Sequence, residues 1–127
     1  MSENEIATVV VDTALKVHIK LGPGLLESVY AVVLAYELRK HGLTVKREEP
    51  IALRYESLIF EEGFRADLII DDKLIIEVKS LDKVAPVHKK QLLTYLRLTD
   101  MKLGLLINFG DYYLKDGIAR VVNGLQE

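Results

Sequence analysis

The chain has 127 residues, of which 50% are hydrophobic and 28% are charged, and its formal net charge is −2. This composition is typical of a globular protein, and the length predicts a single domain over residues 1–127. The absence of cysteine excludes disulfides and thiolate metal sites, and the net charge means that any nucleic-acid contact needs a local basic patch. No apolar run is long enough to span a membrane, and the first ten residues lack a signal-peptide pattern. We therefore expect a cytoplasmic protein without membrane contact.

Two helices are predicted before the first strand. Apolar residues at helical spacing indicate an amphipathic helix over residues 3–20, which LGPG at 21–24 ends. Its apolar stripe is expected to pack on the sheet or on another subunit. A second helix is expected over residues 25–41, with Gly42 as its C-terminal cap. Its apolar side is predicted at Val29, Val33, Tyr36 and Leu38 or nearby residues.

The middle of the chain predicts strands. Residues 45–48 and 51–55 have strand character interrupted by Pro50, which indicates an edge strand or a bulge. After a turn at 55–57, a strand is expected to return over residues 58–70, with a bend at Gly63. The next strand is expected over residues 74–79.

The last third predicts a helix and further strands. Pro86 suits the first turn of a helix over residues 86–98. Residues 103–108 are nearly all apolar and indicate a strand that is buried on both faces. Residues 112–114 and 118–122 are expected to be final strands or edge pieces. This order predicts an α/β (α+β) fold in which helices flank a mixed central sheet.

The segment FRADLIIDDKLIIEVKS, residues 64–80, places charges inside two apolar strands. Because strand residues alternate between faces, the register that aligns both apolar faces puts Ile70 opposite Leu74, with a three-residue turn. In this register Phe64, Ala66, Leu68 and Ile70 share one face, while Asp67 lies opposite Glu77 on the other, with Lys79 two residues further on. Facing carboxylates repel each other, by roughly 3 to 4 kcal/mol at an effective dielectric near 20.

A divalent cation would remove this repulsion. Two carboxylates suit Mg²⁺ or Mn²⁺, and a neighbouring ammonium completes a site for metal-assisted phosphodiester hydrolysis. The alternative is an ordinary solvated strand face, because Glu-x-Lys is common in strands.

Three sequence segments carry a resemblance. DLIIDDKLIIEVKS resembles the core of the PD-(D/E)XK nuclease superfamily, GLLESVY at 24–30 resembles the motif of the GxxExxY family, and QLLTY at 91–95 resembles the Gln-x-x-x-Tyr motif of the superfamily's exonuclease branch. The motifs stand in the family's order over residues 21–110. One departure is Ala66, where the family pattern has proline. The resemblance implies a restriction-endonuclease-like fold.

The resemblance also implies roles for individual residues. Metal ligands would be Asp67, Glu77, the backbone carbonyl of Val78 and, directly or through water, Glu27. Lys79 would be the catalytic lysine, acting with Gln91 and Tyr95, which lie one helical turn apart. Each has an alternative: Glu27 suits the start of a helix electrostatically, Gln91 could be an exposed helix residue, and Tyr95 could be a core aromatic.

Substrate contacts are expected from a cluster of basic residues after the Glu-x-Lys strand, which includes His88, Lys89 and Lys90. If they flank the cleft they would hold phosphates; the alternative is a solvated helix face. We expect a Mg²⁺- or Mn²⁺-dependent nuclease, with DNA favoured over RNA as the substrate, in a chain that is able to form a homodimer. The alternatives are a non-catalytic nucleic-acid- or protein-interaction module on the same fold and hydrolysis of another phosphate-containing substrate.

Overall fold

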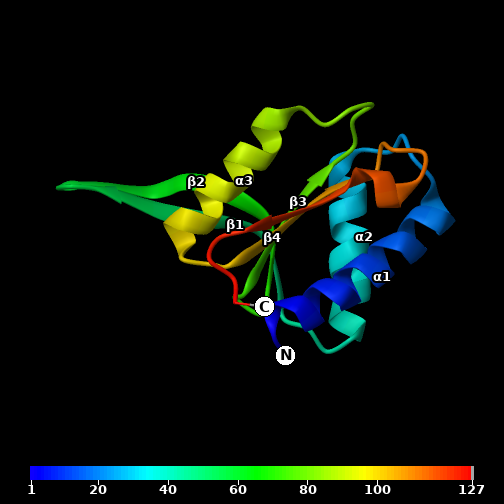
Figure 1. The fold of residues 1–127 in the computed structure, drawn as a ribbon, viewed down its shortest axis with the longest axis horizontal. Helices are drawn as coiled ribbons and strands as arrows, with labels where there is room; N and C mark the ends of the chain where they lie inside the picture. Colours follow the sequence, from blue (N-terminus) through cyan, green and yellow to red (C-terminus); the bar gives the residue numbers. More distant parts are fainter. Residues whose placement is uncertain (127) are drawn as a thin grey trace.

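The computed structural model describes residues 1–126 and contains five strands and three α-helices (Figure 1). In chain order these are α1 Glu3–Leu21, α2 Glu27–Lys40, β1 Val45–Tyr55, β2 Leu58–Ile70, β3 Leu74–Lys79, α3 Pro86–Thr99, β4 Leu103–Asn108, the 3₁₀ turn η1 Leu114–Gly117 and β5 Ile118–Val122. The predicted fold class is confirmed, because helices flank one mixed sheet. None of the described helices is long and apolar enough to cross a membrane.

The sheet has the strand order β1-β2-β3-β4-β5. All neighbours are antiparallel except β3 and β4, which run parallel and are joined through α3, as a parallel pair requires a crossover connection. Ile70 pairs with Leu74 across a three-residue turn, which confirms the predicted register. β1 and β5 form the two edges, and β4 is buried along its whole length, as its apolar sequence predicts.

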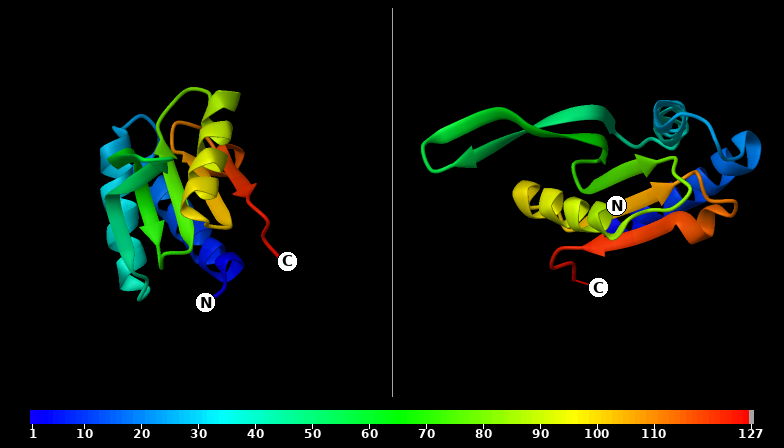
Figure 2. Two further views of the ribbon diagram at one scale, coloured as in Figure 1. Left: turned by 90° about the vertical axis from the view of Figure 1, so that its left-hand side faces the viewer. Right: turned by 90° about the horizontal axis from the view of Figure 1, so that it is seen from above.

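The sheet separates two hydrophobic clusters, and Figure 2 shows the helices in layers on either side of it. Buried residues of α1 and α2 pack against one face of the sheet, which includes Leu68, Ile70 and Val78. Leu92 and Leu96 of α3 pack against the other face, with Ile69 and Ile75. The sheet is therefore the middle of three layers, and the carboxyl ends of β3 and β4 lie between the helices.

The two N-terminal helices pack as the sequence predicts only in part. Ser2 caps α1 through a reciprocal pair of hydrogen bonds with Glu5. In α2 the buried residues are Tyr30, Ala31, Leu34, Ala35 and Leu38, whereas Val29 and Tyr36 are exposed. The predicted apolar side of α2 was therefore wrong at these two positions, because the residues that pack into the core lie in the adjacent row of the helix.

The β1–β2 hairpin extends past the rest of the sheet as a two-stranded arm (Figures 1 and 2). Pro50 lies in edge strand β1, as predicted, and the register shifts between Ile51 and Leu53. The extra residues are in β2 around Gly63, where an added Cβ would lie 2.5 Å from the Cβ of Leu53. The bulge therefore requires glycine at this position.

One predicted strand is absent. Residues 111–113 form a bend that leads into η1 at Leu114, so the predicted strand over 112–114 was wrong. Leu114 packs into the core, and this burial accounts for the apolar character that the sequence shows there. β5 confirms the other predicted edge strand.

Candidate active site

Asp67 lies where the alternation of β2 changes. Phe64 and Ala66 pack with the α3 cluster, whereas Leu68 packs with the α1–α2 cluster, so the prediction that all of them share one face with Ile70 was wrong. The physical reason lies in the partner strand, where Glu48 has the left-handed backbone angle φ 50 and its pairing with Asp67 is missing from the ladder. Asp67 therefore stands at the junction of the two faces.

At this junction the Asp67 carboxylate accepts a hydrogen bond from β3 in place of a backbone carbonyl of β2. The β2–β3 ladder ends at Leu68 and Ile76, and the next free N–H on that side, from Val78, donates to Oδ2 of Asp67 at 2.8 Å. This bond fixes the carboxylate beside β3. Its position next to Glu77 agrees with the predicted register, although the two residues form no backbone pair.

Glu77 is a buried carboxyl group in β3. It is 6% exposed, and its Oε1 is buried without any hydrogen-bond partner. Burial, then the charge of Asp67, raises the pKa of Glu77 to about 9, and Lys79 offsets part of this pKa shift. The raised pKa favours the protonated form of Glu77 in the metal-free protein, which reduces the repulsion that two facing carboxylates would produce.

Lys79 follows Glu77 on the same face of β3 and is half-buried. Its backbone carbonyl accepts a hydrogen bond from Phe109 at 2.8 Å, so the strand end is fixed while the side chain remains available. Within residues 1–126 its ammonium forms no ion pair. The positive charge of Lys79 beside Glu77 is thus not neutralised by an ion pair with another side chain of residues 1–126.

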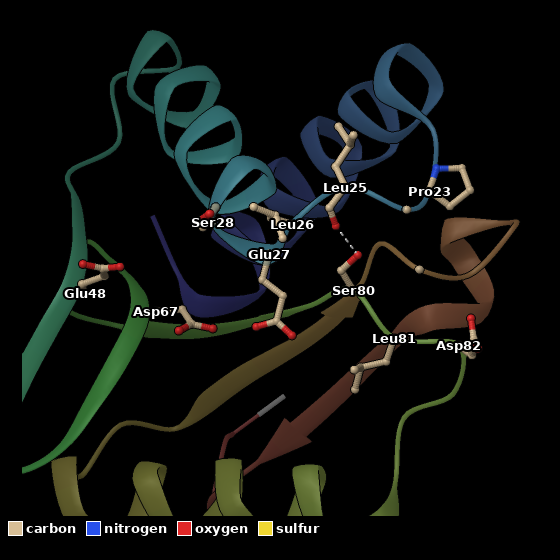
Figure 3. Close-up of a pocket in the computed structure, with 13 residues that line it drawn as sticks. Pro23, Leu25, Leu26, Glu27, Ser28, Glu48, Asp67, Ser80, Leu81 and Asp82 are labelled. Atoms are coloured by element: carbon tan, nitrogen blue, oxygen red, sulfur yellow. Dashed lines mark hydrogen bonds between the residues drawn. The ribbon is translucent and has the colours of Figure 1, made fainter.

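A hollow of about 900 Å³ opens between the start of α2 and the sheet. Glu27, Glu48 and Asp67 line it, together with Ser80 and Asp82. In Figure 3 the Glu27 side chain points from α2 toward the sheet, on the side where Asp67 lies. Glu77 is not among the lining residues, so the hollow reaches Asp67 but not Glu77.

The segment before α2 is held by the buried Tyr30. Its ring stacks on Phe109 with centroids 4.4 Å apart, and its hydroxyl donates to the Gly22 carbonyl and accepts from the Leu25 N–H. Ser80, after β3, donates to the Leu25 carbonyl at 2.6 Å (Figure 3). These contacts set the position of Glu27, the first residue of α2.

Asn108 organises the opposite wall and was not singled out by the sequence analysis. It is fully buried at the end of β4. Its side-chain amide accepts from the N–H groups of Leu81 and Gly110 and donates to the Leu81 carbonyl and to Asp111. The signal in the sequence is a polar residue at the carboxyl end of an apolar strand. Glu48, Ser80 and Asp82 were also missed, because nothing local in the sequence brings them to the hollow.

The α3 residues divide into buried and exposed groups. Tyr95 stacks on Phe64 with centroids 3.9 Å apart, and burial, followed by the charges of Glu77 and Asp67, raises the pKa of Tyr95. It therefore lies beside the carboxyl pair. Gln91, one turn earlier, is exposed. His88 accepts a hydrogen bond through Nδ1 from the Ala85 N–H at 3.2 Å, so it caps the start of α3, and Lys89 and Lys90 are exposed.

A family model described as the PD-(D/E)XK nuclease superfamily matches residues 4–121. The chain belongs to this superfamily. The match includes every residue of the candidate site. No curated protein and no solved structure matches the chain.

Members of the PD-(D/E)XK superfamily typically use divalent metal ions, and two observations test whether these residues fit one. Oε1 of Glu77 is buried without a hydrogen-bond partner and lies beside Asp67. A cation bound by the two carboxyl groups would give this oxygen a partner. Among residues 1–126, however, no three His, Asp or Glu side chains are close enough together to hold a metal ion, so Glu27 is not grouped with Asp67 and Glu77. The pair fits a cation whose remaining ligands are backbone oxygen, water or substrate.

Proposed function

We propose that this chain is a divalent-metal-dependent nuclease that hydrolyses phosphodiester bonds, with DNA rather than RNA as its substrate. The observation that carries the proposal is the buried, unpartnered oxygen of Glu77 beside Asp67, in a chain of the PD-(D/E)XK superfamily. A buried carboxyl that has no partner destabilises the fold, so its presence is best explained by a ligand that it binds in the working state.

Three groups, one from β2 and two from β3, would hold Mg²⁺ or Mn²⁺. Asp67 and Glu77 supply carboxylate oxygens, and Val78 supplies its backbone carbonyl. In a strand, the C=O of a residue points to the same side as its N–H, and the Val78 N–H points to Asp67. The bound cation would polarise the scissile phosphate and lower the pKa of a coordinated water. Glu27 would act through a water, because it lines the hollow with Asp67 without joining the carboxyl pair.

Lys79 would be the catalytic lysine. Its ammonium stands two residues from Glu77 on one strand face and has no ion-pair partner among residues 1–126. It would orient the attacking water and stabilise the negative charge that develops on the phosphate. Gln91 and Tyr95 would line the substrate side of the site, and His88, Lys89 and Lys90 would lie along the substrate backbone at the start of α3.

We further propose that the chain belongs to the GxxExxY group, because GLLESVY at 24–30 resembles its motif. The three defining positions have separate uses in this fold. Gly24 has φ +99, in the left-handed region that favours glycine. Glu27 begins α2, and Tyr30 is fully buried. The chain has no cysteine, which is compatible with a reducing compartment. A cytoplasmic location stays a prediction.

The test is cleavage of labelled single- and double-stranded DNA and RNA with Mn²⁺, Mg²⁺ or a chelator. We expect metal-dependent cleavage that Lys79→Ala reduces by about a hundredfold or more. The matched control is Lys102→Ala, which removes an exposed lysine that pairs with Asp100 and should leave cleavage unchanged. Equal activity of the Lys79→Ala variant and the wild type would contradict the assigned role.

A second candidate function is a non-catalytic interaction module. One observation favours it: the lining of the hollow includes Glu27, Glu48, Asp67 and Asp82 and no Lys or Arg among the described residues, a lining that repels phosphate in the absence of a cation. This alternative predicts no cleavage of any nucleic acid with either metal. Metal binding by the wild type without cleavage would support it over the nuclease.

A further inference from the structure

The outer part of the β1–β2 hairpin, residues 51–62, is called the arm here, and it has one apolar face. Leu53 pairs with Phe60, and Tyr55 pairs with Leu58, so these four side chains lie on the same side of the ribbon. Tyr55 is 65% exposed, Leu58 is 56% exposed and Phe60 is 48% exposed. A two-stranded ribbon is only marginally stable by itself in water, so a second surface that covers this face would stabilise the arm.

The charge of the arm argues against a nucleic-acid contact. One arginine, Arg54, stands against three glutamates, Glu56, Glu61 and Glu62, which gives a net charge of −2 over residues 51–62. Ribbons that bind a phosphate backbone do so with Lys and Arg. Glu62 is bound to Arg65 at 2.6 Å, whereas Glu56 and Glu61 form no ion pair within residues 1–126. The chemistry fits a protein surface that is apolar and basic.

The same chain carries such a surface between α1 and α2. This α1–α2 groove has a volume of about 250 Å³, and its lining includes the apolar Val17, Leu21 and Val33 and the basic Lys16 and Lys20. The acidic Glu37 also lines it and forms an ion pair with Lys40. Neither Lys16 nor Lys20 has an ion-pair partner among residues 1–126. The groove therefore presents exposed positive charge beside apolar side chains.

The outer side of α2 extends this apolar surface. Val29, Val33 and Tyr36 follow helical spacing and lie in one row, of which Val29 is 39% and Tyr36 is 59% exposed. Val29 and Tyr36 belong to the α2 face that the sequence pattern marks as apolar and that the core leaves uncovered, whereas Val33 packs partly against the core. An exposed apolar row next to a groove is typical of a protein-interaction surface.

We propose that the arm of one copy docks on the α1–α2 groove and the α2 row of a second copy of this chain. The apolar face of the arm covers the apolar groove, and Glu56 and Glu61 approach Lys16 and Lys20. The partner is a second copy because both complementary surfaces, opposite in charge and unpartnered, belong to the same chain.

The placement of the two surfaces supports a closed dimer. The arm and the α1–α2 pair lie at opposite ends of the longest axis of the molecule (Figure 1). Two copies that lie side by side and antiparallel bring each arm to the other copy's groove, and a two-fold axis closes the assembly. A standard interface buries roughly 800 Å² on each partner, and the four apolar side chains of one arm cover only part of that area. In a two-fold dimer the contact between arm and groove occurs twice, which doubles the buried area.

The first experiment is analytical ultracentrifugation of the whole chain across a range of protein concentrations. We expect the wild type to have twice the 14.4 kDa mass of one chain. Leu58→Ser/Phe60→Ser should raise the dimer dissociation constant about tenfold or more. The matched control is Ile59→Ser, because Ile59 is 68% exposed on the opposite face of the same ribbon, and it should leave the dimer intact. A monomeric wild type would overturn the proposal, as would an unchanged dimer in the Leu58→Ser/Phe60→Ser variant.

A charge exchange tests the docking partner itself. Glu56→Lys/Glu61→Lys on the arm and Lys16→Glu/Lys20→Glu on the groove should each weaken the dimer about tenfold, and the variant that combines all four changes should recover it. All of these positions are exposed, and thermal unfolding checks that each variant is folded. If either reversal leaves the dimer unchanged, or if the combined variant stays monomeric, the arm does not dock on the groove, and packing of one arm against the other becomes the better explanation.

Discussion

Asp67 and Glu77 are neighbouring carboxyl groups in opposite situations. Oδ2 of Asp67 accepts the Val78 N–H at 2.8 Å, whereas Oε1 of Glu77 is buried without a partner. The first carboxylate is part of the fold, and the second, whose charge Lys79 offsets in part, is stabilised by holding a proton or by binding a ligand.

The stability of the metal-free protein should fall as the pH rises from about 5 to about 9. The pKa of Glu77 is raised from 4.5 to about 9 in the folded protein, so over this range the native state binds more protons than the unfolded state. The free energy of unfolding then decreases with pH, by at most about 1.4 kcal/mol per pH unit. Urea unfolding at several pH values measures the slope, and Glu77→Gln should flatten it. An equal slope in the wild type and the variant would show that Glu77 ionises normally.

Metal binding should be coupled to loss of the Glu77 proton. A cation requires the deprotonated carboxyl, so Mn²⁺ binding should release about one proton and should strengthen as the pH rises toward the pKa of about 9. Calorimetry in two buffers of different ionisation enthalpy measures the released protons. Asp67→Asn/Glu77→Gln should abolish binding, while the control Asp72→Asn, in the exposed turn where Asp72 pairs with Lys46, should retain it. Binding of Mn²⁺ without proton release would contradict a protonated Glu77.

Tyr30→Phe should loosen the segment that positions Glu27. The change keeps the stacking on Phe109 but removes the hydroxyl that bonds the Gly22 carbonyl and the Leu25 N–H. We expect a loss of about 1 kcal/mol in the free energy of unfolding and faster amide exchange over residues 22–28. Tyr36→Phe is the control, because Tyr36 is exposed, and its effect should stay within about 0.5 kcal/mol. Unchanged exchange in Tyr30→Phe would mean that Ser80 holds the segment without the tyrosine.

Asn108→Ala should disrupt the wall formed by the loops after β3 and β4. The substitution leaves the backbone groups of Leu81 and Gly110 without the partners that the buried amide provides, which should cost about 2 to 4 kcal/mol of unfolding free energy. Hydrogen exchange should rise at residues 80–82 and 109–111. The exposed Ser57→Ala, in the turn of the arm, serves as the control. If exchange at these loops matched the wild type, the amide would be dispensable for the wall.

The local sequence was sufficient for the register of the β2–β3 hairpin. Its two apolar runs have only one alignment that hides both, and this alignment also brings Asp67 beside Glu77. Strict alternation failed at Ala66 and Leu68, because the left-handed backbone of Glu48 on the neighbouring strand changes the face there. A strand's own sequence does not show the conformation of its partner.

By itself, the sequence determined the kinds of elements, the register of the central hairpin and the presence of Asp67, Glu77 and Lys79 in it. These features follow from hydrophobic periodicity and turn chemistry, which act between residues close along the chain. Only the tertiary structure decided that Glu27 and Glu48 line a hollow with Asp67, that Asn108 ties two loops together, and that α2 buries Tyr30 rather than Val29 and Tyr36. Those outcomes depend on contacts between distant segments, where the packing of each helix against the sheet selects which of two apolar rows is buried.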